Sequence, residues 1–223
     1  MQQIFEGKVY DIIKKPDGFV FSYLEQKIDD EHSLIRFKMF DTKTGNITDV
    51  AKNVYLLSKF GSNYKPAIKL TDNFVTVKSI YLPSGKLFLC KNTGECFLLD
   101  GDGSILWTGS ILYRDEAPSD IALYNNCVWA SFYENNVLIR FNIATMREEL
   151  RIGGKKSPFL NPCSIFTDDN IATVCSAGSN SLTRVDLDTY SVEPYREFNQ
   201  SLKNYIKSGA FEFVLLESGI YKL

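Results

Sequence analysis

The chain has 223 residues, 44% of them hydrophobic, which is enough apolar material for one sizeable core or two small ones. Its 25 Lys and Arg residues are offset by 27 Asp and Glu residues, and the basic residues are dispersed along the sequence. A nucleic-acid binder normally carries a basic excess or a basic stripe, so the charge pattern argues against a nucleic-acid partner.

The N-terminus and the cysteines indicate the compartment. Residues 1–15 show no basic segment followed by an apolar one, and no apolar run approaches the roughly 20 residues that a membrane helix needs. The five cysteines are odd in number and lack C-x-x-C spacing. Cys90 and Cys96 are expected to face each other across a hairpin as reduced, packed thiols, with a disulfide between them as the alternative. These features predict a soluble cytoplasmic protein without a membrane partner.

A hydrophobic strand that ends on an Asp or Asn at a turn recurs along the chain. The four tip residues are Asp41, Asp100, Asn142 and Asp186, about 40 to 60 residues apart, and a further short strand follows each of them. The stretch from Asp186 round through both termini to Asp41 is long enough for two units, which makes five in all. Internal repeats of about 45 residues are typical of β-propellers. The sequence therefore predicts an all-β, five-bladed β-propeller.

The third and fourth units agree in detail. Residues 118–141 and 162–185 each contain three short strands rich in Val, Ile, Phe and Tyr, joined by turns of Asn, Asp, Gly and Ser. Trp129 is expected in the core between blades. In the second unit we prefer the register in which the third strand ends at Asp100, and the alternative makes residues 86–94 the third strand and tip.

Two connectors are predicted to contain helix. The first is an insertion between the first two tips, where Val54, Leu57 and either Leu56 or Phe60 could share one side of a helical turn. The second is residues 198–209, where apolar residues recur at helical spacing and Gly209 stands where a C-cap would.

The fifth unit is split between the two ends of the chain. Residues 210–223 supply two strands and stop where a tip should come, and residues 3–7 supply the missing fourth strand. We expect Ile4 to Glu6 to pair with Ile220 to Lys222, because a closed ring leaves only short, protected sheet edges. The sequence thus predicts one domain over residues 1–223, whose last blade is closed by the N- and C-terminal strands.

Parts of the repeat resemble known propeller families. Phe40 to Gly45 and Phe97 to Trp107 resemble the repeats of pyrroloquinoline-quinone-dehydrogenase-like propellers, and Pro118 to Phe141 is similar to NHL and YVTN-type repeats. The resemblance implies the scaffold alone, because such propellers include enzymes, sugar binders and protein-binding platforms. Nothing matches the cofactor or metal residues of the quinone enzymes, so no cofactor is expected.

Three motifs that could carry chemistry are better explained by loop structure. His32, the single histidine, lies in a polar segment expected to be a hairpin loop. Asp100 to Ser104 resembles the start of a calcium loop, but Ile105 and Ile111 occupy the positions of its Gly and Glu. Gly153 to Ser157 lacks the spacing of a phosphate-binding loop. We therefore predict no catalytic residue and no metal site.

The candidate binding site lies in the irregular connectors between blades, because binding residues concentrate on loops held by a rigid scaffold. The expected function is a non-enzymatic binding platform for a protein or a small molecule, including a saccharide. One alternative is a lectin-like propeller, which would need exposed aromatic residues in equivalent loops. The other is a hydrolase or lyase with carboxylates at the channel mouth. The candidate residues are Tyr64, Lys65, Arg114, Asp115, Lys155, Lys156 and Asn161.

Overall fold

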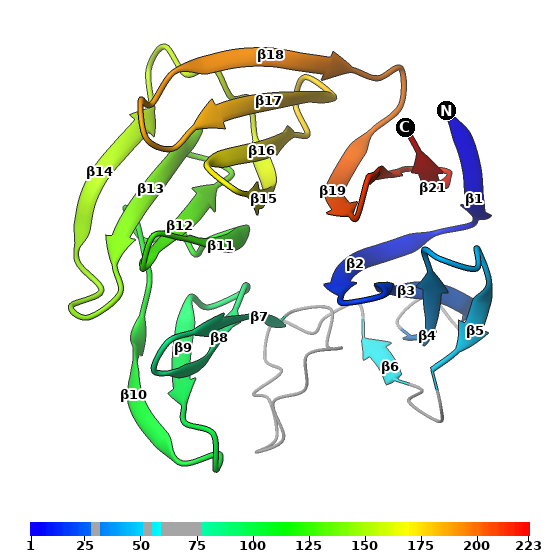
Figure 1. Ribbon diagram of the computed structural model, residues 1–223, viewed down its shortest axis with the longest axis horizontal. Coiled ribbons are helices and arrows are strands. Elements are labelled where there is room, and N and C mark those ends of the chain that lie inside the picture. The colour runs from blue at the N-terminus through cyan, green and yellow to red at the C-terminus, as the bar shows by residue number, and fades with distance from the viewer. Residues whose placement is uncertain (28–31, 51–54, 59–76) are drawn as a thin grey trace. The chain divides into compact units, whose positions relative to one another are not determined.

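The computed structural model describes residues 1–27, 32–50, 55–58 and 77–223. The regular secondary structure in these ranges consists of β-strands (Figure 1). The chain divides into two compact units. Unit 1 comprises Met1–Val75 and Lys203–Leu223, and unit 2 comprises Thr76–Leu202. Within the described ranges, no helix has the length and hydropathy needed to cross a membrane.

Unit 2 contains three antiparallel sheets of four strands, which correspond to the predicted second, third and fourth blades. Blade 2 consists of β7 (Val77–Leu82), β8 (Gly85–Cys90), β9 (Glu95–Leu99) and β10 (Ile105–Ser110). Blade 3 consists of β11 (Asp120–Tyr124), β12 (Cys127–Phe132), β13 (Val137–Asn142) and β14 (Glu148–Gly153). Blade 4 consists of β15 (Pro162–Asp168), β16 (Ile171–Ser176), β17 (Ser181–Asp186) and β18 (Val192–Glu197). The preferred register of the second unit, with its third strand running up to Asp100, is confirmed.

Unit 1 contains the predicted first and fifth blades. Blade 1 consists of β2 (Val9–Lys15), β3 (Gly18–Lys27), β4 (His32–Asp41) and β5 (Ile47–Asp49), and β6 (Tyr55–Ser58) also pairs with β4. Blade 5 consists of β19 (Leu202–Ser208), β20 (Phe211–Leu216), β21 (Gly219–Lys222) and β1 (Gln2–Glu6). Consecutive strands of each blade are hydrogen-bonded neighbours, and in blade 5 the order is β19, β20, β21 and β1.

The two ends of the chain share blade 5, as the sequence predicted. β1 runs antiparallel to β21, with Gln2 opposite Lys222 and Phe5 opposite Ile220. β1 begins one residue earlier than the expected strand over residues 3–7. The expected pairing of Ile4 to Glu6 with Ile220 to Lys222 is shifted by one to two residues, because Lys222 lies opposite Gln2 and a bulge follows Gln3. The N-terminal strand thus covers an edge of β21 that would otherwise present unpaired backbone groups.

The predicted helix over residues 198–209 is wrong, because Leu202–Ser208 forms strand β19. Its buried residues alternate with partly exposed ones at both ends, which is the period of a strand, and Gly209 adopts φ +60° in the turn to β20 instead of capping a helix. The helical turn expected in the insertion is also not found where the structure describes it, since Leu57 lies in β6. Val54 and Phe60 lie outside the described residues. His32 begins strand β4 instead of lying in a loop.

The tip residues each close a hairpin by accepting two backbone N–H groups. Asp186 Oδ1 accepts from Asp188 and Thr189 at 2.9 and 2.8 Å. The side chains of Asp41, Asp100 and Asn142 make the corresponding pairs of bonds in their own turns. A short polar side chain is required there because it bonds the backbone of the next residues in an Asx turn.

A second repeated bond joins the end of the fourth strand to the middle of the blade in blades 2, 3, 4 and 5. The residue directly after the fourth strand donates its N–H to a carbonyl in the turn between the second and third strands. The bonds are Ile111 to Gly94, Gly154 to Asn136, Phe198 to Asn180 and Gly7 to Ser218, at 2.9, 3.2, 2.9 and 3.1 Å. Gly94, Asn136 and Asn180 all adopt positive φ, the conformation that Gly and Asn tolerate best.

Neighbouring blades within each unit pack through apolar faces. In unit 2, Trp129 of blade 3 is fully buried beside Val174 of blade 4, which confirms its predicted core position. In unit 1, the rings of Phe19 and Phe40 in blade 1 lie 5.0 and 5.6 Å from the ring of Phe213 in blade 5. Burial of such aromatic and branched side chains supplies most of the stabilisation of a sheet protein.

The tip carboxylates give a prediction on acid stability. Two backbone N–H bonds lower the pKa of Asp186, and likewise that of Asp41. Because the folded pKa lies below the unfolded value of about 3.9, the stabilisation is present above that value and is lost as the pH falls through the folded pKa. Asp186→Asn should therefore unfold in urea with less pH dependence between about pH 5 and pH 2 than the parent chain.

A second carboxylate tip provides the matched variant for this prediction. Asn142 shows that an amide oxygen can make the same two backbone bonds. Asp41→Asn should therefore also unfold with less pH dependence over the same interval, and the loss of stability at pH 7 should be larger in Asp186→Asn, because Asp186 Oδ2 also accepts a hydrogen bond from Asn170 Nδ2 at 3.1 Å. An unchanged pH dependence in both variants would contradict the role assigned to the tip carboxylates.

Candidate functional site

Polar side chains occupy one equivalent position on the first strand of every blade. In all five blades this position lies four residues before the end of the strand. The residues are Asp11, Lys78, Asp120, Ser164 and Asn204. This row was not predicted from the sequence, although a polar residue directly before isoleucine recurs at positions 11, 120 and 164.

Asp120 is the centre of this row in unit 2. The residue is 2% exposed, and its carboxylate lies 3.1 Å from the Lys78 ammonium of blade 2. It also accepts hydrogen bonds from the Ser164 hydroxyl of blade 4 at 3.0 Å and from the backbone N–H groups of Ile121 and Ile165. Asp120 thus links three blades, and four donors surround its carboxylate.

Asp11 and Asn204 form the corresponding link in unit 1. Asn204 Nδ2 donates to Asp11 Oδ1 at 2.7 Å, and Asp11 Oδ1 also accepts from the backbone N–H of Ile12. Both residues are buried. These groups hold blades together, and their donors and acceptors are directed at one another instead of at a ligand.

The buried thiols beside the row are poor nucleophiles. Burial raises the pKa of Cys163 to about 12, and the nearby Asp120 carboxylate adds to the effect. Burial also raises the pKa of Cys175. All five cysteines are free, as expected for Cys90 and Cys96. Within the described ranges, no cluster of three or more His, Cys, Asp or Glu side chains could hold a metal ion.

The predicted residues Arg114 and Asp115 form the exposed tip of a tight turn. Both adopt positive φ, and Tyr113 and Glu116 close the turn with two backbone hydrogen bonds of 3.0 Å. The Arg114 guanidinium lies 5.3 Å from the Tyr113 ring centroid, and Arg151 lies 4.3 Å from the same ring. The Glu116 carboxylate anchors the turn by accepting bonds from the backbone of residues 134 and 135.

Asn161 has a structural role that the sequence did not reveal. Its backbone N–H donates to Asn136 Oδ1 at 2.6 Å, and its side-chain amide donates to the Tyr133 carbonyl at 3.2 Å. Its own carbonyl accepts from Ala177 at 2.9 Å. Lys155 and Lys156, in the same connector, are exposed.

The structure brings these two connectors to one turn. The turn at residues 133–136 binds Glu116 of the first connector and Asn161 of the second, so the exposed Arg114, Lys155 and Lys156 border the same part of blade 3. Tyr64 and Lys65, the remaining candidates, lie outside the described residues.

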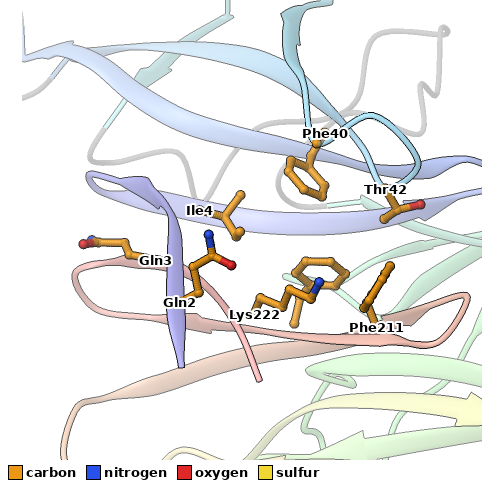
Figure 2. A pocket seen from close by; sticks show the side chains of 9 residues that line it. Gln2, Gln3, Ile4, Phe40, Thr42, Phe211 and Lys222 are labelled. Atoms are coloured by element: carbon orange, nitrogen blue, oxygen red, sulfur yellow. The ribbon is translucent and has the colours of Figure 1, made fainter.

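Unit 1 contains a pocket that the sequence analysis did not predict, about 320 Å³ in volume (Figure 2). It lies between blade 5 and the tip turn of blade 1. The lining residues are Gln2, Gln3 and Ile4 of β1, Phe40, Thr42 and Gly45 at the tip of blade 1, Phe211 and Phe213 of β20, and Lys222 of β21.

The pocket combines an aromatic floor with a few polar groups. Phe213 and Phe40 are 1% and 6% exposed, and their rings meet edge to face. The Lys222 ammonium lies 3.4 Å from the centroid of the half-exposed Phe211 ring. Figure 2 shows Gln3 directed away from the other labelled side chains. The lining contains no carboxylate, imidazole or thiol.

Comparison with known proteins identifies a fold but no family. No protein-family model matches the chain, and no curated protein matches its sequence. Among solved structures, a streptogramin B lyase is similar at 15% identity and a TM-score of 0.52, over 98% of this chain and 69% of that one. Sqt1 from Saccharomyces cerevisiae is similar at 7% identity and a TM-score of 0.55, over 96% of this chain and 72% of that one.

A glutaminyl cyclase from Myxococcus xanthus is similar at 10% identity and a TM-score of 0.52, over 99% of this chain and 91% of its own. At such low identity the similarity concerns the fold alone. Together with the five sheets, it shows that the chain is an all-β, five-bladed β-propeller whose last blade combines the N- and C-terminal strands. The predicted scaffold resemblance is thereby confirmed.

The role assigned to Asp120 gives a second prediction. Asp120→Ala removes the carboxylate that accepts from Lys78 and Ser164, so that a partly buried ammonium and a buried hydroxyl lose their acceptor. The substitution should therefore lower the free energy of unfolding by about 3 kcal/mol. The exposed pair of Lys43 and Asp17, 2.7 Å apart, is the matched control. Asp17→Ala should change the stability by less than about 1 kcal/mol. Urea unfolding measures both, and similar losses would contradict the structural role of Asp120.

Proposed function

We propose that this chain is a β-propeller that binds a small molecule in the unit 1 pocket without transforming it. The observation that carries the proposal is the lining of the pocket, in which the rings of Phe40 and Phe213 adjoin the polar groups of Gln2, Thr42 and Lys222. Ligand sites are usually concave and apolar, with a small number of polar groups that fix orientation. A volume of about 320 Å³ suits a compact ligand.

Binding is favoured over catalysis by the chemistry of this lining. General acid–base and nucleophilic catalysis use carboxylates, imidazoles, thiols or activated hydroxyls held against a partner group. The pocket presents none of the first three, and the buried carboxylates Asp11 and Asp120 are occupied by donors from neighbouring blades. Two similar structures are named as a lyase and a cyclase, so turnover must be measured beside binding.

A protein partner is the second candidate, favoured by the two connectors that meet at residues 133–136. Arg114, Lys155 and Lys156 are exposed there on backbone that is held by Glu116 and Asn161. The lectin-like alternative is less favoured, because exposed aromatics such as Tyr81 and Phe211 do not occupy equivalent positions in their blades. The cytoplasmic location remains a prediction.

A fragment screen tests the small-molecule proposal. Uniformly ¹⁵N-labelled protein is titrated with a library of compact neutral, anionic, cationic and sugar fragments, and amide shifts are followed by NMR. Saturable shifts should concentrate at Thr42, Gly45, Phe211 and Lys222, with no product formed by the fragments or by a panel of chromogenic glycosides and lactones. Turnover, or fragment hits confined to other parts of the chain, would overturn the proposal.

Charge reversal tests the protein-binding candidate. Arg114→Glu and Lys155→Glu should each weaken retention of a partner captured from a lysate, because rim charges steer and orient a complementary surface. The melting temperature should stay nearly unchanged, since both side chains are exposed. Asn161→Ala is the contrasting variant, because loss of its hydrogen bonds should lower the melting temperature. Unchanged partner binding in both charge variants would remove this surface from consideration.

A further inference from the structure

The unit 1 pocket corresponds to one residue difference between otherwise matching tip turns. Gly45, Met146 and Tyr190 occupy the same position, and their N–H groups donate to the carbonyls of Asp41, Asn142 and Asp186 at 2.8, 2.7 and 2.8 Å. Their φ angles are +74°, +50° and +61°. The three turns therefore direct the side chain at this position in the same way.

In the other two turns this side chain packs onto the preceding blade. The Tyr190 ring lies 6.4 Å from the ring of Trp129, and its hydroxyl accepts a hydrogen bond from Arg140 Nη1 at 2.7 Å. Met146 packs against the core cluster shared by blades 2 and 3. A pocket of about 210 Å³ remains beside Tyr190, smaller than the one beside Gly45.

The surface facing Gly45 is equivalent to the surface that receives Tyr190. Trp129 is paired with Arg140 across blade 3, and Phe213 is paired with Lys222 at the same place in blade 5. A Cβ added to Gly45 would meet no atom within 4 Å. The pocket is therefore the space that a side chain at position 45 would fill. At the tip of blade 4 the equivalent space is filled by the phenol ring of Tyr190.

The charge in the two places differs. Arg140 is paired with Glu149, whose carboxylate lies 3.3 Å away. Lys222 is opposite the neutral Gln2 and forms no ion pair in the part of the chain that the structure describes. The pocket therefore presents an ammonium group without a bound carboxylate, next to aromatic faces.

We propose that the pocket binds a small aromatic carboxylate, and that Gly45 is the residue that admits it. The ring of the ligand takes the place that the Tyr190 ring fills at the tip of blade 4, against Phe213, and its carboxylate binds the Lys222 ammonium. A charge-assisted bond of this kind is stronger than one between neutral groups. This assignment rests on the proposed function and names the ligand class for the same pocket.

Three probes with one ring system test the assignment: 2-naphthoate, the neutral 2-naphthamide and the cationic 2-(aminomethyl)naphthalene. Amide shifts of ¹⁵N-labelled protein give the dissociation constants. 2-Naphthoate should bind about tenfold or more tightly than 2-naphthamide, and the cation should bind most weakly. Lys222→Met should weaken 2-naphthoate about 10- to 100-fold and change 2-naphthamide less than about twofold.

Gly45 variants test the opening of the pocket. Gly45→Tyr should abolish saturable binding of 2-naphthoate, and Gly45→Met, with the residue of the third tip, is the second filled variant should the first fold poorly. Gly45→Ala is the matched control, because it carries the same backbone strain without filling the pocket. All three should lower the melting temperature by about 2–8 °C, and Gly45→Ala should keep binding within about threefold.

The outcomes separate the ligand class from the proposed function. Equal binding of the three probes, or preference for the cation, with loss in Gly45→Tyr, overturns the carboxylate class and leaves a small-molecule pocket. If 2-naphthoate shows no saturable binding at concentrations up to about 5 mM, the aromatic-carboxylate class is also overturned. The proposed small-molecule function would still stand if other fragments bound at Gly45. Binding of 2-naphthoate that persists in folded Gly45→Tyr overturns the role of Gly45.

Discussion

The tip turn is the constraint on which the other features of this propeller depend. One carboxylate or amide oxygen accepts two backbone N–H groups, and the fifth residue of the turn returns its own N–H to the carbonyl of the first. These bonds set where the fourth strand begins. In the turns at residues 41–45, 142–146 and 186–190 they also hold the fifth residue at positive φ. In the last two turns the side chain of this residue, Met146 or Tyr190, packs on the preceding blade of the same unit. One turn thus controls both the pairing within a blade and the packing between two blades.

Much of the fold was predictable because its signals are local and repeated. The tip residues Asp41, Asp100, Asn142 and Asp186 are visible in the sequence because few side chains can make the Asx bonds of such a turn. The split blade followed from counting units. The strand β19 was missed because Leu202, Tyr205 and Ile206 are also spaced as on a helix, and only its partners distinguish the two structures. Asn204 bonding to Asp11, far away in the sequence, is a contact of that kind.

The candidate site was less predictable, because it depends on contacts between blades. The charged connectors could be found by composition, and the structure brings two of them to the turn at residues 133–136. The structural role of Asn161 could not be found, since it depends on a hydrogen bond to Asn136. The pocket was marked in the sequence by Gly45 standing where other tips have Met146 and Tyr190. The glycine indicates a pocket only when the structure shows that Phe213 and Lys222 lie across from it in the same cavity.

The most direct test of this account is a crystal structure of Gly45→Tyr at high resolution. The new ring should fill the pocket and pack on Phe213, with its hydroxyl directed at Lys222, in the way that the Tyr190 ring lies by Trp129 with its hydroxyl bonded to Arg140. The tip turn itself should keep its bonds to Asp41. A tyrosine side chain that turned to solvent and left the pocket open would contradict the claim that the pocket is the space of a missing side chain.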